Sequence, residues 1–138
     1  MATVHNPDLQ LYRRIVEQSP DAVIFADAKG TIRLWNASAA AIFGFTEAEA
    51  LGQNLDLIIP EKLRAAHWRG YDLAMTTGRT KLGGKALATR GTHKSGAKLY
   101  VEMAFTVISD ERAGVLGALA TARDITQRYL AERARKSP

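Results

Sequence analysis

His67 is the side chain of this sequence best placed to do chemistry. It shares an apolar stripe of helical spacing with Leu63, Tyr71 and Met75, away from the charged face of the same segment. An imidazole on that stripe points inward, and its neutral form binds metals through a ring nitrogen. Gly70 lowers the stability of a helix interior by about 1 kcal/mol relative to alanine. A glycine there indicates that a flat group or a strand lies close to the helix backbone. The alternative is a partly buried histidine at the rim of an ordinary core.

The other polar residues form no catalytic or metal-binding pattern. His93 lies in a predicted turn, His5 lies near the N-terminus, and neither has the spacing of a helical metal pair with His67. The chain contains no cysteine, which excludes thiolate metal sites, iron–sulfur clusters, disulfides, cysteine nucleophiles and flavin–thiol photochemistry. The glycine-rich segment 78–85 lacks the residue order of a phosphate-binding loop. Because no nucleophile or kinase motif appears either, we expect a protein without enzymatic activity.

Composition and charge favour one globular domain with no nucleic-acid or membrane partner. The 138 residues suffice for a single core, and 46% hydrophobic with 24% charged residues is typical of a soluble fold. The formal charge is +5, but the basic residues are scattered and form no patch for nucleic acid. No apolar run approaches the roughly 20 residues of a membrane helix, and the N-terminus lacks the apolar core of a signal peptide. A cytoplasmic location is therefore expected.

Local signals predict the helices and strands that position His67. Asn36 is a helix N-cap, Thr46 begins a capping box with the glutamate three residues later, and Pro60 and Gly78 bracket the long helix. The predicted elements are a helix 9–18, strands 22–26 and 31–35, short helices after residues 36 and 46, a helix 61–77, strands 85–92, 97–108 and 115–123, and a final helix opened by a capping box of Asp124 and Gln127. Five strands with helices on one face are typical of an α+β domain built on one antiparallel sheet.

Three segments of the sequence resemble PAS domains: EQSPDAVIFADAKGTIRLWNASAAAIFGFTEAEALGQNLDLIIPE, HKSGAKLYVEMAFTVI and ARDITQRYLAE. They extend over nearly the whole chain. The resemblance implies a PAS fold, with an N-terminal flanking helix in residues 1–18, a PAS core in residues 19–123 and a C-terminal signalling helix and tail in residues 124–138. It also implies a sensory or dimerising module in signal transduction, which acts through an effector kinase or regulator and does no chemistry itself.

The long helix also resembles that of the heme-binding PAS domains of the FixL type. In PEKLRAAHWRGY, the axial histidine of those domains falls on His67, so the resemblance implies heme b with its iron bound by His67. The residues expected to line the pocket are Leu63, Tyr71 and Met75 on the helix, Leu87 on the next strand, and Met103 and Phe105 on the one after. Lys81, with Arg79, is the cation expected near the heme propionates.

Leu87 occupies the position at which the FixL type has the arginine that stabilises bound oxygen. A charge-assisted hydrogen bond to oxygen is therefore missing, and an apolar distal side favours carbon monoxide or nitric oxide as the diatomic ligand. Met103 offers an alternative, a thioether as sixth ligand in a redox or ligand-exchange sensor. Its ordinary role would be that of a flexible core residue.

Two alternatives to heme stay open at this point. One is a PAS module without a cofactor that interacts with other proteins. The other is redox sensing by FAD stacked on Trp35 or Trp68, although each tryptophan is equally suited to the core or to an interface. A homodimer is expected in every case, because the helix at residues 9–18 presents more apolar surface than it needs for itself.

Overall fold

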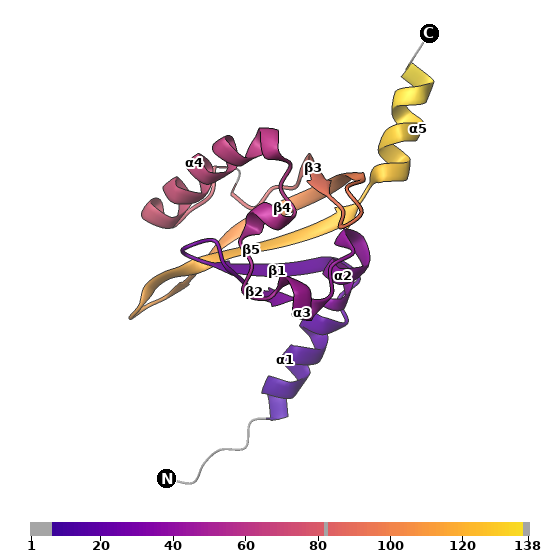
Figure 1. Cartoon of the computed structure of the whole chain (residues 1–138). Helices are drawn as coiled ribbons and strands as arrows, with labels where there is room; N and C mark the ends of the chain where they lie inside the picture. Colours follow the sequence, from indigo (N-terminus) through magenta and orange to yellow (C-terminus); the bar gives the residue numbers. More distant parts are fainter. Residues whose placement is uncertain (1–6, 82, 137–138) are drawn as a thin grey trace.

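The chain folds around one antiparallel sheet of five strands, in the order β2-β1-β5-β4-β3 (Figure 1). The computed structural model describes residues 7–81 and 83–136. The elements are α1 (Pro7–Glu17), β1 (Ala22–Asp27), β2 (Ile32–Trp35), α2 (Ala37–Phe43), α3 (Glu47–Ala50), the 3-10 helix η1 (Leu55–Leu57), α4 (Glu61–Thr77), β3 (Leu87–Thr92), β4 (Lys98–Asp110), β5 (Gly114–Asp124) and α5 (Thr126–Lys136). The predicted α+β fold is confirmed.

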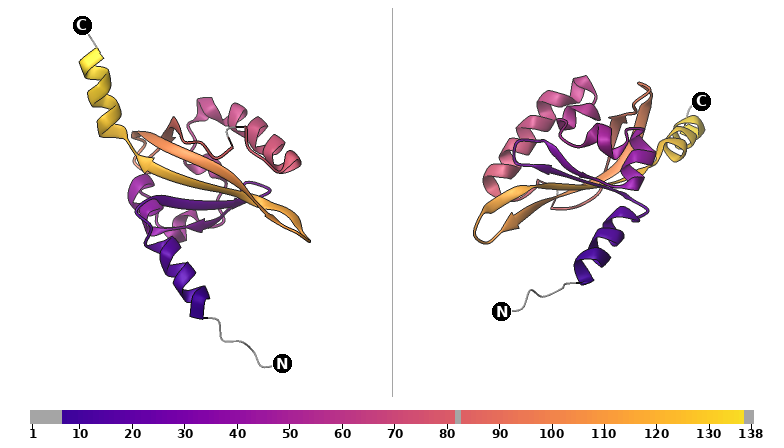
Figure 2. Two further views of the ribbon diagram at one scale, coloured as in Figure 1. Left: turned by 180° about the vertical axis from the view of Figure 1, so that it is seen from behind. Right: turned by 60° about the horizontal axis from the view of Figure 1, so that its bottom comes forward.

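The helices divide into a group that covers the sheet and two that leave it. In the right-hand view of Figure 2, α4 lies on one side of the sheet and α1 on the other, while α5 continues outward from the end of β5. Within residues 7–81 and 83–136, no helix combines the length and the apolar character needed to cross a membrane. α4 thus faces the sheet on the side opposite to α1.

Asn36 fixes the first half of the fold. It is the one polar residue among the described residues that is fully buried, with 2% of its surface exposed. Its Oδ1 accepts hydrogen bonds from the backbone N–H groups of Val23 and Ala39, at 2.9 and 3.0 Å. Its Nδ2 donates to the carbonyl groups of Val16 and Asp21, at 2.8 and 3.1 Å. The predicted cap of α2 is confirmed, and the same side chain also ties the end of α1 to β1.

Most of the largest fully buried side chains lie on β1, β2 and α2. The largest fully buried side chains are Trp35, Phe43, Ile24, Ile32 and Val101. The Trp35 indole donates a hydrogen bond to the Phe45 carbonyl at 2.9 Å, and its ring centroid lies 5.7 Å from that of Phe43. A buried indole is stable only when its N–H finds such a partner, so Trp35 is a core residue.

The strands β3, β4 and β5 form the half of the sheet that faces α4. Along β4, burial alternates as predicted, with Leu99, Val101 and Met103 buried and their polar neighbours less so. Leu87 on β3 lies directly opposite Met103 on β4. The side chains of alternate residues on these strands therefore point toward α4.

The structure differs from the predictions in three places. Residues 55–57 form a 3-10 helix that was not predicted. Asp124 caps the start of α5 through the N–H of Thr126, at 2.9 Å, and no bond to Gln127 was found among the described residues. Gly70 is exposed, and a Cβ placed on it would meet no atom within 4 Å. No strand lies against the helix there and Gly70 is not among the residues that line the cavity, so the close packing predicted from Gly70 is not found.

Candidate functional site

A cavity of about 330 Å³ lies between α4 and the sheet. It is lined by Ile24, Ala26, Phe43, Leu55, Ile58, Ile59, Leu63, Ala66, His67, Leu87, Thr89, Arg90, Gly91, Met103, Phe105, Ala118 and Ala120. Small-molecule sites in proteins have volumes of about 300 to 1,000 Å³ and are mostly apolar, with a few polar groups. The cavity has both properties, which makes it the candidate site.

Small residues of the sheet create this space. Ala26, Ala118 and Ala120 line the cavity from β1 and β5, and Gly91 lines it from β3. Gly91 is buried, and a Cβ placed there would lie only 3.1 Å from Cε1 of Phe43. Long aliphatic side chains at these four positions would fill the interior, as they do in most cores. The sequence of the sheet therefore leaves room beneath α4.

His67 lines this apolar space and carries a buried polar atom without a partner. Its Nδ1 is the one buried side-chain nitrogen or oxygen, in the part of the chain that the structure describes, that has no hydrogen-bond partner. Leaving such an atom unsatisfied costs about 1 to 3 kcal/mol, and buried groups of this kind need an explanation. A hydrogen-bond partner for Nδ1 would remove the cost.

The environment of His67 keeps its imidazole neutral. Burial lowers the pKa of His67, and the nearby carboxylates of Asp56 and Asp72 offset only part of this effect. At neutral pH the side chain is therefore in the form that offers a lone pair to a metal. This is the protonation state that an axial ligand requires.

Two aromatic neighbours hold this part of α4 in place. The Tyr71 hydroxyl lies 2.5 Å from the carbonyl oxygen of Asp27, to which it donates, and burial raises the pKa of Tyr71 to about 12. The Trp68 indole donates to the Asp56 carboxylate at 2.8 Å. The centroids of the Trp68 and Tyr71 rings lie 4.6 and 5.6 Å from that of His67. The position of the imidazole is thus set by side chains that bond to the body of the domain.

The donor set is too small for a bare metal ion. Residues 7–81 and 83–136 contain no group of three or more His, Cys, Asp or Glu side chains that could surround an ion. A metal held in a macrocycle needs less from the protein, because the ring supplies four ligands and the protein adds one axial ligand and an apolar enclosure. The residues present therefore fit heme and do not fit a free ion.

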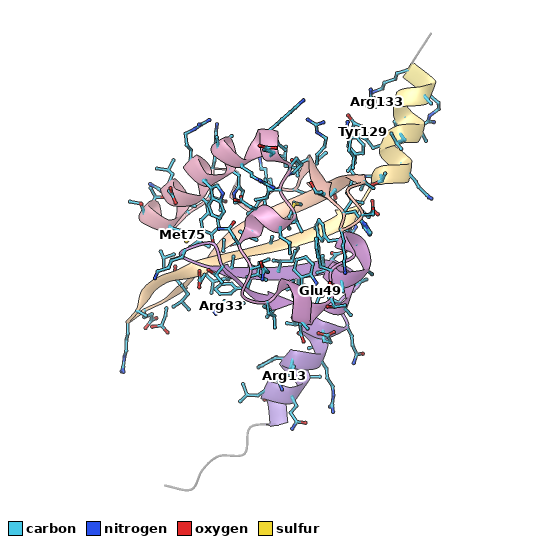
Figure 3. The ribbon with its side chains drawn as sticks, viewed as in Figure 1. Arg13, Arg33, Glu49, Met75, Tyr129 and Arg133 are labelled. Carbon is cyan, nitrogen blue, oxygen red and sulfur yellow. The ribbon has the colours of Figure 1, made fainter. Side chains whose placement is uncertain are left out.

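The structure brings together five of the eight predicted site residues. Leu63, His67, Leu87, Met103 and Phe105 all line the cavity. Tyr71 and Met75 pack in the core beside it without lining it, and Met75 lies further along α4 (Figure 3). Lys81 is exposed in the loop after α4 and does not reach the cavity. The apolar stripe of the helix predicted that the cavity extends along α4 as far as Met75, but it ends at His67.

Neither tryptophan is placed to stack on a ligand in the cavity. Trp35 is 1% exposed in the core, and Trp68 covers Gly30, where a Cβ would lie 2.2 Å from its ring. Both indole N–H groups are bonded within the domain. The stacking partner that was expected for a flavin is therefore not provided by either residue.

Arg90 is the charged residue of the cavity wall that was not predicted from the sequence. It lines the cavity from β3, and it also lines a second hollow of about 390 Å³ together with Leu63, Ala88, Thr89, Tyr100, Tyr129 and Arg133. Its position on a strand of mixed polar and small residues gave no periodic signal. Only the meeting of α4, β3 and α5 in space identifies it.

Comparison with known proteins identifies one family and several related sensor proteins. The model of a family described as the PAS fold matches residues 10–125. The chain is 42% identical over 55 residues to the sensor protein FixL of Bradyrhizobium diazoefficiens, which covers 40% of this chain and 11% of FixL. It is 26% identical over 109 residues to the oxygen sensor protein DosP of Escherichia coli, which covers 79% of this chain and 13% of DosP. The chain thus spans a small part of the length of these relatives.

A solved structure agrees with the fold described above. The crystal structure of the PAS domain of a protein from Colwellia psychrerythraea superimposes with a TM-score of 0.76 at 24% sequence identity. The match covers 88% of this chain and 99% of that one. At this identity the likeness supports the fold alone, and the ligand has to be argued from the cavity.

Proposed function

Because the chain belongs to the PAS family, whose members are generally sensory modules without catalysis, we propose that it senses its signal through heme b bound in the cavity beneath α4. His67 is the axial ligand in this proposal. The observation that carries it is the buried, unpaired Nδ1 of His67 in an otherwise apolar enclosure. Heme supplies a metal centre that binds small diatomic molecules or changes redox state.

The cavity explains why one protein ligand suffices. The imidazole is neutral, so it is ready to bind iron without losing a proton. The remaining walls are aliphatic or aromatic apart from a threonine and an arginine, as a dry heme pocket requires. The similarity to FixL and to an oxygen sensor, DosP, supports the same reading.

Reconstitution with hemin tests the proposal directly. The purified chain should take up hemin with a Soret band of a histidine-ligated heme, and His67→Ala should abolish that band. His93→Ala is the matched control, because His93 lies in a turn where its Nδ1 is bonded to Ser95, so this variant should keep the wild-type spectrum. A wild-type chain that stays colourless with hemin, or a Soret band that survives His67→Ala, would show the proposal to be wrong.

The walls of the cavity suggest which diatomic ligand is favoured. Leu87, Met103 and Phe105 line it from β3 and β4 and offer no hydrogen-bond donor. We therefore propose that carbon monoxide or nitric oxide is preferred to oxygen, unless the Met103 thioether occupies the sixth position. Leu87→Arg should raise oxygen affinity at least tenfold, since a charge-assisted hydrogen bond contributes about 1.5 to 3 kcal/mol. Wild-type oxygen affinity equal to that of the arginine variant would contradict the preference.

A homodimer formed through α1 is a second proposal, and it holds with or without heme. Leu9, Leu11, Tyr12 and Ile15 are each more than half exposed, at 64, 51, 59 and 57%. An isolated helix of 11 residues is marginal in water, so a second copy of the same helix is the simplest cover. The flanking helices, outside a PAS core of residues 19–123, would then carry the signal to an effector kinase or regulator.

Light scattering of a double variant tests the dimer. Leu11→Glu with Ile15→Glu should yield a monomer at concentrations at which the wild type is a dimer. Leu73→Glu is the control, because Leu73 is equally exposed, at 62%, but lies on α4. A dimer that persists in the double variant would rule out α1 as the interface.

A further inference from the structure

We propose that Arg90 binds an acidic group of the ligand at the exit of the cavity, which in heme is a propionate. The inference rests on the proposed heme site and adds to it the anchor that orients the ring. It replaces Lys81, the cation expected from the sequence, which does not line the cavity.

Arg90 is the one permanently charged residue among the described residues that line the cavity. Four other arginines are already paired: Arg33 with Asp27, Arg64 with Asp56, Arg123 with Asp21 and Arg128 with Glu102. No hydrogen bond or ion pair to a described side chain occupies the Arg90 guanidinium. Its donors are therefore available to a ligand.

The surroundings of Arg90 are suited to an anion. Together with Leu63 and Thr89, it belongs both to the wall of the cavity and to the second hollow, so the two spaces adjoin along this wall. The second hollow adds Tyr100, Tyr129 and Arg133, and no carboxylate among the described residues lines either space. Tyr129 and Arg133 lie on α5 (Figure 3), and the Arg133 guanidinium is 5.8 Å from the centre of the Tyr129 ring.

The two spaces together match the two parts of an amphipathic ligand. The cavity is apolar and suits a flat hydrophobic body, whereas the hollow beside it is lined by the basic residues Arg90 and Arg133. A guanidinium binds a carboxylate with two parallel charge-assisted hydrogen bonds, which a lysine cannot do. Heme b has this division, with an apolar ring and two carboxylates on one edge.

Hemin and its dimethyl ester separate the anchor from the axial ligand. The two compounds have the same iron and ring, but the ester has no carboxylates. We expect the wild-type chain to release hemin about tenfold more slowly than the ester, as the loss of one charge-assisted hydrogen bond implies. Transfer to excess apomyoglobin gives the release rates, and the Soret band reports whether His67 is still bound.

Arg90→Gln should release hemin about tenfold faster than wild type and should release the ester at the wild-type rate. Arg90→Lys should recover part of the loss, because it keeps the charge without the paired donors. Lys81→Ala is the matched control and should change neither rate. Arg90 is exposed, so these variants are expected to fold, which circular dichroism checks.

The outcomes distinguish the two proposals. A normal His67-dependent Soret band with unchanged hemin release in Arg90→Gln would overturn the anchor and leave the heme site standing. Faster hemin release in Lys81→Ala but not in Arg90→Gln would also overturn the Arg90 proposal and would identify Lys81 as the residue that binds the propionate. Failure of the wild-type chain to bind hemin would remove both proposals together.

Discussion

The two halves of the sheet are built differently. Around β1, β2 and α2, side chains such as Trp35 and Phe43 are fully buried, and the buried amide of Asn36 has all four of its hydrogen bonds. Around α4 and β3, only Tyr71, Ala74 and Gly91 are buried, and Leu87 is 50% exposed. The first half is a finished core. The second half lines the cavity and carries the His67 imidazole, whose Nδ1 has no hydrogen-bond partner among the described residues.

The largest loss of stability should come from a substitution in the half around β1, β2 and α2. Asn36→Ala would leave the N–H groups of Val23 and Ala39 and the Asp21 carbonyl without this partner, whereas the Val16 carbonyl would keep its bond from the Ser19 N–H. Each buried group left unpaired costs about 1 to 3 kcal/mol. We expect at least about 3 kcal/mol loss in the free energy of unfolding, measured by urea denaturation. Asn36→Asp should lower the free energy of unfolding at least as much, because it buries a carboxylate whose second oxygen would face the Val16 and Asp21 carbonyls. A loss below about 1 kcal/mol would mean that this half is not rigidly held.

Ligand binding should stabilise the other half selectively. At a free hemin concentration of about 100 times Kd, linkage predicts about 2.7 kcal/mol of added stability. Hydrogen exchange should show new protection in α4 and β3, with little local change in β1 and β2 beyond the global increase. If local opening became equally rare in both halves after hemin is added, the proposed difference between the halves would be contradicted.

A smaller loss of stability should follow from removing a hydrogen bond that holds α4. Tyr71→Phe removes the hydroxyl that donates to the Asp27 carbonyl, with an expected loss of about 1 kcal/mol in the free energy of unfolding. The same variant should release hemin faster, since Tyr71 packs against His67. Tyr12→Phe is the control, because Tyr12 is 59% exposed. Equal stability of the Tyr71 variant and wild type would show that this bond does not hold α4.

The smallest effect on stability concerns a surface pair that joins α3 to the turn between β3 and β4. The Lys94 ammonium, which is hydrogen-bonded to Glu49, holds the pKa of that carboxyl below its ordinary value, and the Thr46 N–H adds to this. The lowered pKa means that the pair stabilises the fold above the ordinary glutamate pKa and that this contribution is lost as the pH falls through the lowered one. Lys94→Gln should raise the pKa of Glu49 in an NMR titration. No rise would show that the pair is not formed in solution.

The sequence predicted what depends on near neighbours and missed what depends on distant ones. The cap at Asn36, the capping box at Thr46 and the bounds of α4 each follow from residues within a few positions, and all three are confirmed. The 3-10 helix was missed because a single turn has no hydrophobic period. Arg90 was missed because its neighbours in space come from three elements far apart in the chain. The helical stripe placed His67 correctly but could not show where the cavity ends.

Tyr100 gives the base of α5 a mechanical property. Its N–H donates to the Thr126 hydroxyl at 3.0 Å, its carbonyl accepts from the Ile125 N–H at 2.8 Å, and its ring stacks on Tyr129 with centroids 4.1 Å apart. The helix is thus clamped to β4, although its chain leaves from β5. With 11 residues it is about 16 Å long, and its base is bonded to a strand that also lines the cavity. A small rotation of the helix about this base would displace its C-terminal end much further than its first turn.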